Sequence, residues 1–298
     1  MYTDYFGLTK KPFSLAPDPD YLYLSPRHIK ALTILEYGLM SQAGFTVVTG
    51  EIGSGKTTLI QHLLNNLDDE FSVGLITNTH IALGDLLTWV LAAFGINVEG
   101  ENKTQRHQLL VDFLRQLHAS QRRAVLIIDE AQNMSLETLE ELRLLSNINN
   151  GSEVTLQLVL VGQPELAEKL RRPELIQFAQ RVSIAFHLTP LSYEQTEKYI
   201  HHRLAIAGGQ VDLFSKNVCA AIYYFSDGVP RLINNICDLA LVFAFADDEK
   251  TVSLQTVIDV IKEQKSGGIV PMSSSKGSDS ERIRKSILES DKVDLEKV

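Results

Sequence analysis

The sequence predicts an α/β protein in which a core of about 190 residues precedes a small all-helical domain. Five short apolar runs rich in β-branched residues alternate with segments of helical periodicity, and this alternation indicates a parallel sheet covered on both faces. From Leu191 onward the strand signals stop and only helical patterns continue. The predicted strands are residues 45–49, 73–77, 124–128, 156–161 and 183–188.

The predicted helices follow from periodicity and from capping signals. Ser192 and Gln195 form a capping box, and Gly208 closes the helix that they open. Pro230 stands at the favoured first position of a later helix. Helices are expected at residues 57–67, 83–94, 104–120 and 135–147 in the core, and at about 215–226, 230–246 and 253–264 after the capping-box helix.

These patterns divide the chain into three parts. Residues 1–190 form the α/β core together with an N-terminal segment, and residues 191–264 form the helical domain. Residues 265–298 form a flexible Ser/Gly-rich linker and a charged tail, and the tail could form a short helix, either alone or only on meeting a partner.

Composition narrows the class of protein. The 298 residues are 44% hydrophobic and carry a formal net charge of −9. The acidity is spread over the structured parts, which disfavours a dedicated nucleic-acid clamp. Buried thiols are the favoured interpretation of Cys219 and Cys237, against a disulfide or redox pair. The N-terminus lacks signal-peptide features and no apolar run reaches 18 residues, so we expect a cytoplasmic protein without a membrane span.

Residues 50–57 match the phosphate-binding pattern G-x-x-x-x-G-K-[ST] between a predicted strand and a predicted helix. Glycines leave backbone N–H groups able to surround a polyphosphate at the positive end of the helix. Lys56 would reach the outer phosphates, and the Thr57 hydroxyl would join a magnesium shell. The predicted nucleotide-binding residues are Gly50, Glu51, Ile52, Gly53, Ser54, Gly55, Lys56, Thr57 and Thr58.

Acidic and amide side chains end two other buried strands. Asp129 suits a magnesium ligand, and Glu130 suits the general base that polarises the attacking water. Gln163 would hydrogen-bond the γ-phosphate or orient the water, although it could also be an ordinary polar residue at a strand end. The acidic pair makes hydrolysis, and not binding alone, the expected outcome.

Arginines supply two further candidates. Arg181 directly precedes the last strand and is our choice for an arginine supplied by a neighbouring subunit, ahead of Arg171 and Arg172. Surface salt bridges are the alternative for all three. Arg231 stands in the first turn of a helix, where its charge opposes the helix dipole, which favours contact with the nucleotide.

Together these motifs resemble the AAA+ ATPases, and within them the ExeA/GspA-type secretion ATPases. The chain is most similar to the variant found with exosortase (PEP-CTERM) and exopolysaccharide export systems. The motifs that carry this resemblance run from Tyr5 to about Gln264 and include Tyr5-Phe6-Gly7-Leu8, Asp129-Glu130-Ala131-Gln132-Asn133, Val161-Gly162-Gln163-Pro164-Glu165-Leu166 and Gly228-Val229-Pro230-Arg231-Leu232-Ile233-Asn234.

The resemblance implies a P-loop NTPase core with strand order 5-1-4-3-2 and a helical lid. It makes Lys56 and Thr57 the phosphate and magnesium ligands, Glu130 the catalytic base, Gln163 sensor 1 and Arg231 sensor 2, with ATP and Mg²⁺ bound. An arginine finger is implied as well, without deciding which arginine supplies it. It also places the N-terminal segment, with Pro12, along the adenine pocket. A homo-oligomer, in a ring or lateral assembly, and an envelope or export-system partner are implied, as is peripheral association with the inner membrane.

Three functions remain in competition on the sequence alone. The favoured one is a cytoplasmic ATPase that drives or regulates assembly of an envelope secretion or polysaccharide export system. A DNA-associated ATPase of the transposition-regulator type shares this kind of core, but the acidic charge counts against it. The third is an ATP-gated binding switch that hydrolysis merely resets.

Overall fold

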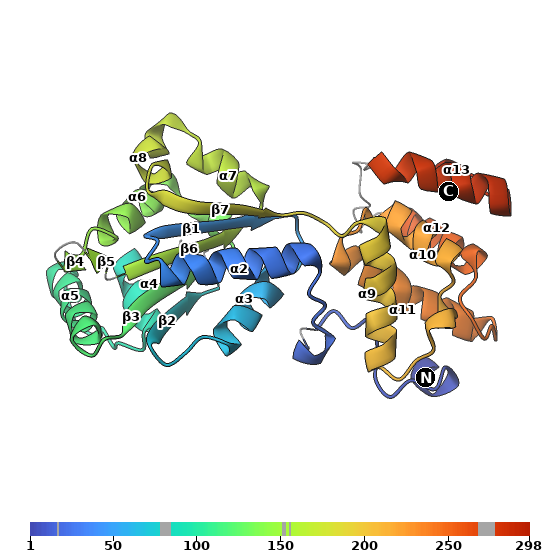
Figure 1. Cartoon of the computed structure of the whole chain (residues 1–298), viewed down its shortest axis with the longest axis horizontal. Helices are drawn as coiled ribbons and strands as arrows, with labels where there is room; N and C mark the ends of the chain where they lie inside the picture. The colour runs from blue at the N-terminus through green and yellow to red at the C-terminus, as the bar shows by residue number, and fades with distance from the viewer. Residues whose placement is uncertain (17, 78–84, 151–152, 155, 268–277) are drawn as a thin grey trace. The chain divides into compact units, whose positions relative to one another are not determined.

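The computed structural model describes residues 1–16, 18–77, 85–150, 153–154, 156–267 and 278–298 (Figure 1). The chain divides into two compact units. The α/β unit consists of Pro26–Glu51 and Lys56–Leu188, and the helical unit consists of Met1–Ser25, Ile52–Gly55 and Thr189–Val298.

A five-stranded sheet forms the centre of the α/β unit. The strands lie in the order β2-β3-β6-β1-β7, and every neighbouring pair is parallel. Counted along the chain, this is the predicted order 5-1-4-3-2 seen from the other edge, so the predicted fold class is confirmed. The strands are β1 (Phe45–Gly50), β2 (Phe71–Ile76), β3 (Arg123–Ile128), β6 (Leu156–Gly162) and β7 (Val182–Leu188).

Burial along the strands follows their position in the sheet. Every residue of β1 and β6 is buried, as expected for inner parallel strands that have helices on both faces. In β7, by contrast, exposed residues alternate with partly buried ones up to Leu188, because this strand lies at the edge of the sheet. The fully buried strands β1 and β6 therefore position the segments that follow their carboxyl ends.

The predicted core helices are all present, and the structure adds others. Helix α2 packs against β7, α4 against β2 and α5 against β3. The start of the predicted helix 83–94 lies partly outside the described residues. Helices α2, α7 and α8 and the hairpin β4–β5 were not predicted. The bounds are α2 (Pro26–Met40), α3 (Lys56–Asn65), α4 (Leu86–Ala93), α5 (Lys103–Ala119), η3 (Ala131–Asn133), α6 (Leu136–Leu145), β4 (Asn149–Asn150), β5 (Glu153–Val154), α7 (Pro164–Leu170), η4 (Pro173–Leu175) and α8 (Ile176–Ala179).

A buried amide explains why a polar residue stands inside β6. The Gln157 side chain is 1% exposed, and its Nε2 donates to the carbonyls of Gly38 (3.2 Å), Leu39 (3.2 Å) and Ala43 (3.4 Å). These carbonyls belong to the last turn of α2 and the segment after it, where backbone acceptors lack helical donors. Gln157 thus connects β6 by hydrogen bonds to the end of α2 and to the segment that leads into β1.

Helices are the main regular structure in the described part of the helical unit. Ser192 and Gln195 form the predicted capping box of α9, and Pro230 occupies the first turn of α11, so both sequence predictions are confirmed. The elements are α1 (Tyr2–Tyr5), η1 (Pro19–Tyr21), α9 (Tyr193–Ile206), η5 (Val211–Leu213), α10 (Lys216–Ser226), α11 (Pro230–Ala246), α12 (Leu254–Gly267), α13 (Ser278–Asp291) and η6 (Leu295–Lys297).

The N-terminal segment differs from its predicted place in the core, because it belongs to the helical unit. Phe13 is 1% exposed and its ring meets that of Phe214 edge-on. The buried Arg203 of α9 donates to the carbonyls of Pro12 (2.5 Å) and Ser14 (3.1 Å). Two contributions explain this placement. The segment buries its aromatic rings, and its carbonyls accept hydrogen bonds from the buried Arg203 guanidinium.

The C-terminal tail forms the short helix that the sequence allowed. Residues 278–291 form helix α13, which packs against α10, while residues 268–277 of the linker lie outside the described residues. Ile283 and Ile287, one helical turn apart, are 4% and 1% exposed. Arg284 binds both carboxylate oxygens of Asp294, at 2.8 and 3.2 Å. The tail therefore has an apolar face and forms a helix within the chain itself.

Two further expectations concern the thiols and the membrane. Cys219 and Cys237 are free and buried, which confirms the thiol interpretation over a disulfide. Among the described residues, no helix combines the length and apolar character needed to cross a bilayer.

Candidate nucleotide-binding site

The phosphate-binding pattern occupies the turn between β1, which ends at Gly50, and α3, which begins at Lys56. Gly53 and Gly55 have φ angles of +78° and +96°, a region that side chains with a Cβ rarely adopt. Glycine is therefore required at both positions for the chain to make this turn. The turn places Lys56 and Thr57 in the first turn of the following helix.

Lys56 is held inside its own loop. The side chain is 6% exposed, and its Nζ donates to the carbonyls of Gly50 (2.7 Å) and Glu51 (2.9 Å). Burial lowers the pKa of the Lys56 ammonium, and the charges of Glu130 and Asp129 oppose that shift. The ammonium thus lies in a partly desolvated position next to two carboxylates, where a polyphosphate would compensate its burial.

Thr57 and Asp129 join two elements that are far apart in the sequence. The Thr57 hydroxyl donates to Oδ2 of Asp129 across 2.8 Å, which links the start of α3 to the end of β3. Asp129 is 5% exposed, and its Oδ1 accepts the backbone N–H of Glu130 at 2.9 Å. A hydroxyl and a carboxylate in contact supply the hard oxygen ligands that magnesium prefers.

Glu130 stands at the centre of a set of amide contacts. Its Oε2 accepts from the Gln132 side-chain amide at 2.6 Å and from the Gln163 amide at 3.3 Å. The Glu130 backbone is left-handed, with φ 54° and ψ 34°. Because β3 and β6 are adjacent and parallel, their carboxyl ends bring Glu130 and Gln163 together as expected.

Arg181 is not brought to the other predicted residues of the same chain. It precedes β7 at the amino end of the sheet, where Val182 pairs with Phe45 at the start of β1. Its guanidinium donates to the Ser146 hydroxyl at 2.9 Å. Lys56, Asp129 and Glu130, by contrast, follow the carboxyl ends of their strands. An intrachain contact of Arg181 with this site is therefore excluded by the topology of the sheet.

Arg231 lies in the first turn of α11, as predicted. Within the helical unit, which includes Ile52–Gly55, its backbone N–H donates to the Gly53 carbonyl at 3.3 Å. A Cβ added at Gly53 would stand 2.4 Å from the Arg231 Cβ. Glycine is thus required here for close approach as well as for its positive φ.

Sequence reasoning missed two residues that touch this site. Gln132 was noted only as part of a motif, although an amide two residues after an acidic pair was a visible signal. Lys169 of α7 carried no signal, because its Nζ contacts the carbonyls of Gln132 (2.5 Å) and Met134 (2.7 Å) only through the tertiary fold. No group of three or more His, Cys, Asp or Glu side chains fit to hold a metal occurs among the described residues.

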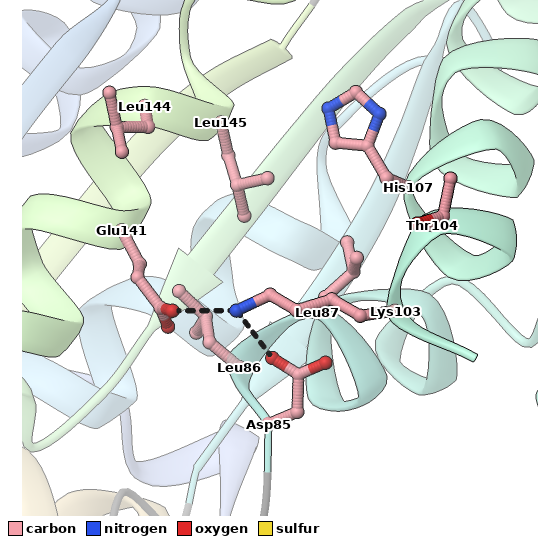
Figure 2. A pocket seen from close by; sticks show the side chains of 9 residues that line it. All are labelled: Asp85, Leu86, Leu87, Lys103, Thr104, His107, Glu141, Leu144 and Leu145. Atoms are coloured by element: carbon pink, nitrogen blue, oxygen red, sulfur yellow. Dashed lines mark hydrogen bonds and ion pairs between the residues drawn. The ribbon is translucent and has the colours of Figure 1, made fainter.

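A separate pocket opens between α4, α5 and α6, with a volume of about 430 Å³ (Figure 2). Figure 2 shows the Lys103 ammonium between two carboxylates, 3.1 Å from Glu141 and 3.9 Å from Asp85. None of the predicted site residues lines this pocket. Its walls are Asp85, Leu86, Leu87, Lys103, Thr104, His107, Glu141, Leu144 and Leu145.

Residues 39–170 match the family model described as an AAA domain, and this range includes the loop, Asp129, Glu130 and Gln163. The chain is thus similar to AAA domains over this range, which is less than half of its length. It is also 42% identical over 251 residues to general secretion pathway protein A of Aeromonas hydrophila. The match covers 83% of this chain and 45% of that protein, so the chain spans less than half the length of this curated relative.

Solved structures show the same fold. The ORC2 protein of Aeropyrum pernix superposes with a TM-score of 0.65 at 17% identity, over 88% of this chain and 73% of that one. Cdc6p of Pyrobaculum aerophilum superposes with a TM-score of 0.64 at 16% identity, over 87% of this chain and 74% of that one. At such identities the likeness concerns the fold alone, which is the P-loop AAA+ fold.

Proposed function

We propose that this chain is an AAA+ ATPase that binds ATP with magnesium and hydrolyses it. One observation carries the proposal: the Thr57 hydroxyl reaches Asp129 at 2.8 Å, so the phosphate-binding loop and the acidic strand end form one site. The match to an AAA domain over residues 39–170 supports it. A solvated acidic turn unconnected to the loop would not produce this contact.

ATP is held in this proposal mainly by the residues of the loop, 50–58. Backbone N–H groups at the positive end of α3 attract the phosphates, and Lys56 exchanges its carbonyl partners for phosphate oxygens. Arg231 contributes a second positive charge from the first turn of α11. The N-terminal segment with Pro12 forms part of the adenine site.

Magnesium fits the oxygen ligands that the chain provides. Thr57 and Asp129 would hold the ion, and the remaining ligands would be phosphate oxygens and water, as is usual for magnesium. The bound ion supplies charge neutralisation on the phosphates. Because a magnesium site of this kind needs only one or two carboxylates, it does not require a cluster of three acidic residues.

Glu130 acts as the general base in the proposed reaction, and Gln163 aids in orienting the water. Both lie at the carboxyl ends of adjacent strands, and the Gln163 amide is 3.3 Å from the Glu130 carboxylate. Glu130 would accept a proton from the water as its oxygen attacks the γ-phosphate. Arg181 would act only on the site of a neighbouring subunit, which makes a homo-oligomer part of the proposal.

The cellular process is proposed from likeness. The 42% identity to general secretion pathway protein A supports a role in powering or regulating an envelope secretion or polysaccharide export system. We further propose the exosortase-associated variant, a cytoplasmic site peripheral to the inner membrane, and an export-system protein as partner. A DNA-associated role is not proposed, because the net charge of −9 disfavours contact with a polyanion.

Replacement of Lys56 tests the catalytic part of the proposal. Lys56→Ala removes the ammonium that lies next to Glu130 and Asp129, so we expect ATP hydrolysis to fall at least about 100-fold. Phosphate release is measured with magnesium present. Lys103→Ala is the matched control, since this lysine lies on the rim of the separate pocket, and its rate should equal wild type. Equal rates for Lys56→Ala and wild type would refute the assignment.

A further inference from the structure

Gln132 connects the Glu130 carboxylate to the neighbouring strand. Its side-chain Nε2 donates to Oε2 of Glu130 at 2.6 Å, a short distance typical of a hydrogen bond to a charged acceptor. Its Oε1 accepts the backbone N–H of Gln163 at 3.1 Å. The Gln132 amide therefore donates to Glu130, which follows β3, and accepts from Gln163, which follows β6. Such a bridge fixes both the distance and the rotation of the carboxylate.

The end of β6 is shaped to admit this amide. A Cβ added at Gly162 would stand 2.8 Å from Oε1 of Gln132 and 2.9 Å from a Leu166 methyl group. Any larger residue at position 162 would displace the Gln132 oxygen from the Gln163 N–H. The Gln163 side chain also donates to Oε2 of Glu130, so two amides converge on one carboxylate oxygen.

The backbone around Gln132 is fixed independently. Glu130 adopts a left-handed conformation that is strained for a residue with a Cβ, and such strain persists where the surroundings enforce it. The Lys169 ammonium donates to the carbonyls of Gln132 and Met134, at 2.5 and 2.7 Å. The short η3 turn is thus held from α7, while Glu130, the residue directly before it, carries the strain.

We infer that Gln132 is a positioning residue that orients the Glu130 carboxylate and ties it to Gln163. The inference rests on the proposed function, in which Glu130 accepts a proton from the attacking water. Gln132 itself lies beside the base and acts through it. Its loss should slow the chemical step and leave nucleotide binding unchanged, because the Lys56 ammonium donates to the Gly50 and Glu51 carbonyls, whereas the Gln132 amide donates to Glu130.

Gln132→Met separates an effect on the chemical step from an effect on nucleotide binding, since methionine has a similar length and lacks the amide. We expect kcat for ATP hydrolysis to fall about 10- to 100-fold, the scale set by a misoriented catalytic group. KM and the affinity for a non-hydrolysable ATP analogue should change less than about twofold. A purely structural role would instead lower the melting temperature and weaken the analogue affinity along with kcat.

Two comparison variants complete the experiment. Gln132→Glu keeps an acceptor for Gln163 but replaces the donor with a second carboxylate, so kcat should be as low as for Gln132→Met. This polar variant gives the same readout if Gln132→Met folds poorly. Gln108→Met is the matched control, because Gln108 is exposed on α5 and donates to Asp112 at 2.9 Å. Its kcat should equal that of wild type.

The outcomes distinguish this inference from the proposed function. Hydrolysis by wild type together with unchanged or faster turnover in Gln132→Met would overturn the inference alone. Turnover restored in Gln132→Glu would also overturn it, since that side chain has no donor for Glu130. Absence of hydrolysis by wild type would overturn the proposed function, and with it the inference.

Discussion

Burial of the two cysteine thiols affects stability at alkaline pH. Burial raises the pKa of the Cys219 thiol from its ordinary 9.0 to about 12, and it also raises the pKa of Cys237 well above that value. The folded state therefore favours the protonated thiol. The unfolded chain releases the same proton at lower pH, so stability is complete below about pH 9 and declines as the pH rises from there toward 12.

Cys219→Ala provides the corresponding measurement. Each thiol that stays protonated only in the folded state should lower the free energy of unfolding by about 1.4 kcal/mol per pH unit above pH 9. Urea unfolding from pH 8 to pH 10.5 should therefore give a shallower decline for the variant than for wild type. Tyrosines titrate in this range in both proteins, so the difference between the two slopes isolates the thiol. Parallel slopes would contradict the prediction.

Individual site residues were predictable where a motif fixes them locally. Lys56 and Thr57 follow from the spacing of the loop, and Asp129 and Glu130 follow from their place at the end of an apolar strand. The contacts of Gln132 and Lys169 could not be predicted in the same way. They depend on the register of β3 against β6 and on the position of α7, which tertiary packing determines.

At the level of elements, the five core strands and helices α9 to α12 of the helical unit were predictable from periodicity and capping signals. Helix α2 was missed, although Pro26 at its first position and the buried Ala31, Leu35 and Leu39 at helical spacing were visible. For helix α13 the sequence left open whether a partner is needed. The apolar surface of α10 provides that partner within the chain, and no local signal identifies such a surface.

The N-terminal segment was misplaced for a similar reason, since its buried partners lie almost 200 residues away. Arg203→Met should release this segment, because the guanidinium donates to the carbonyls of Pro12 and Ser14 and to the Tyr199 hydroxyl at 2.8 Å. Losing these charge-assisted bonds should cost about 2–4 kcal/mol of stability. Hydrogen exchange should accelerate in residues 1–25.

The control for this element is Arg115→Met, which removes an exposed arginine of the α/β unit paired with Asp112 at 3.8 Å. Its exchange pattern in residues 1–25 should match wild type, since exposed ion pairs contribute little. Unaltered protection of the segment in Arg203→Met would show that the aromatic contacts of Phe13 alone hold it, contrary to our expectation.

For the whole molecule, the two ends of the sheet determine which residues can cooperate within one chain. Lys56, Asp129 and Glu130 follow the carboxyl ends of the strands, whereas Arg181 precedes β7 at the amino end. A seven-residue strand spans about 20 Å, so the Arg181 side chain cannot reach the site of its own chain. An arginine finger at this position must therefore serve a second subunit.

Mixing two inactive variants tests this cooperation between subunits. Arg181→Ala leaves its own site intact but supplies no finger, while Glu130→Gln has a disabled site and a normal Arg181. In a random one-to-one mixture, about a quarter of the sites would combine an intact Glu130 with a neighbour's Arg181, as a head-to-tail interface requires. We expect ATP hydrolysis to recover to about a quarter of the wild-type rate, whereas each variant alone stays inactive.

A control mixture of Lys56→Ala with Glu130→Gln should stay inactive, because every site then lacks one of its own residues. Recovery absent from the first mixture, with mixed assembly verified by differently tagged subunits, would rule out Arg181 as the finger.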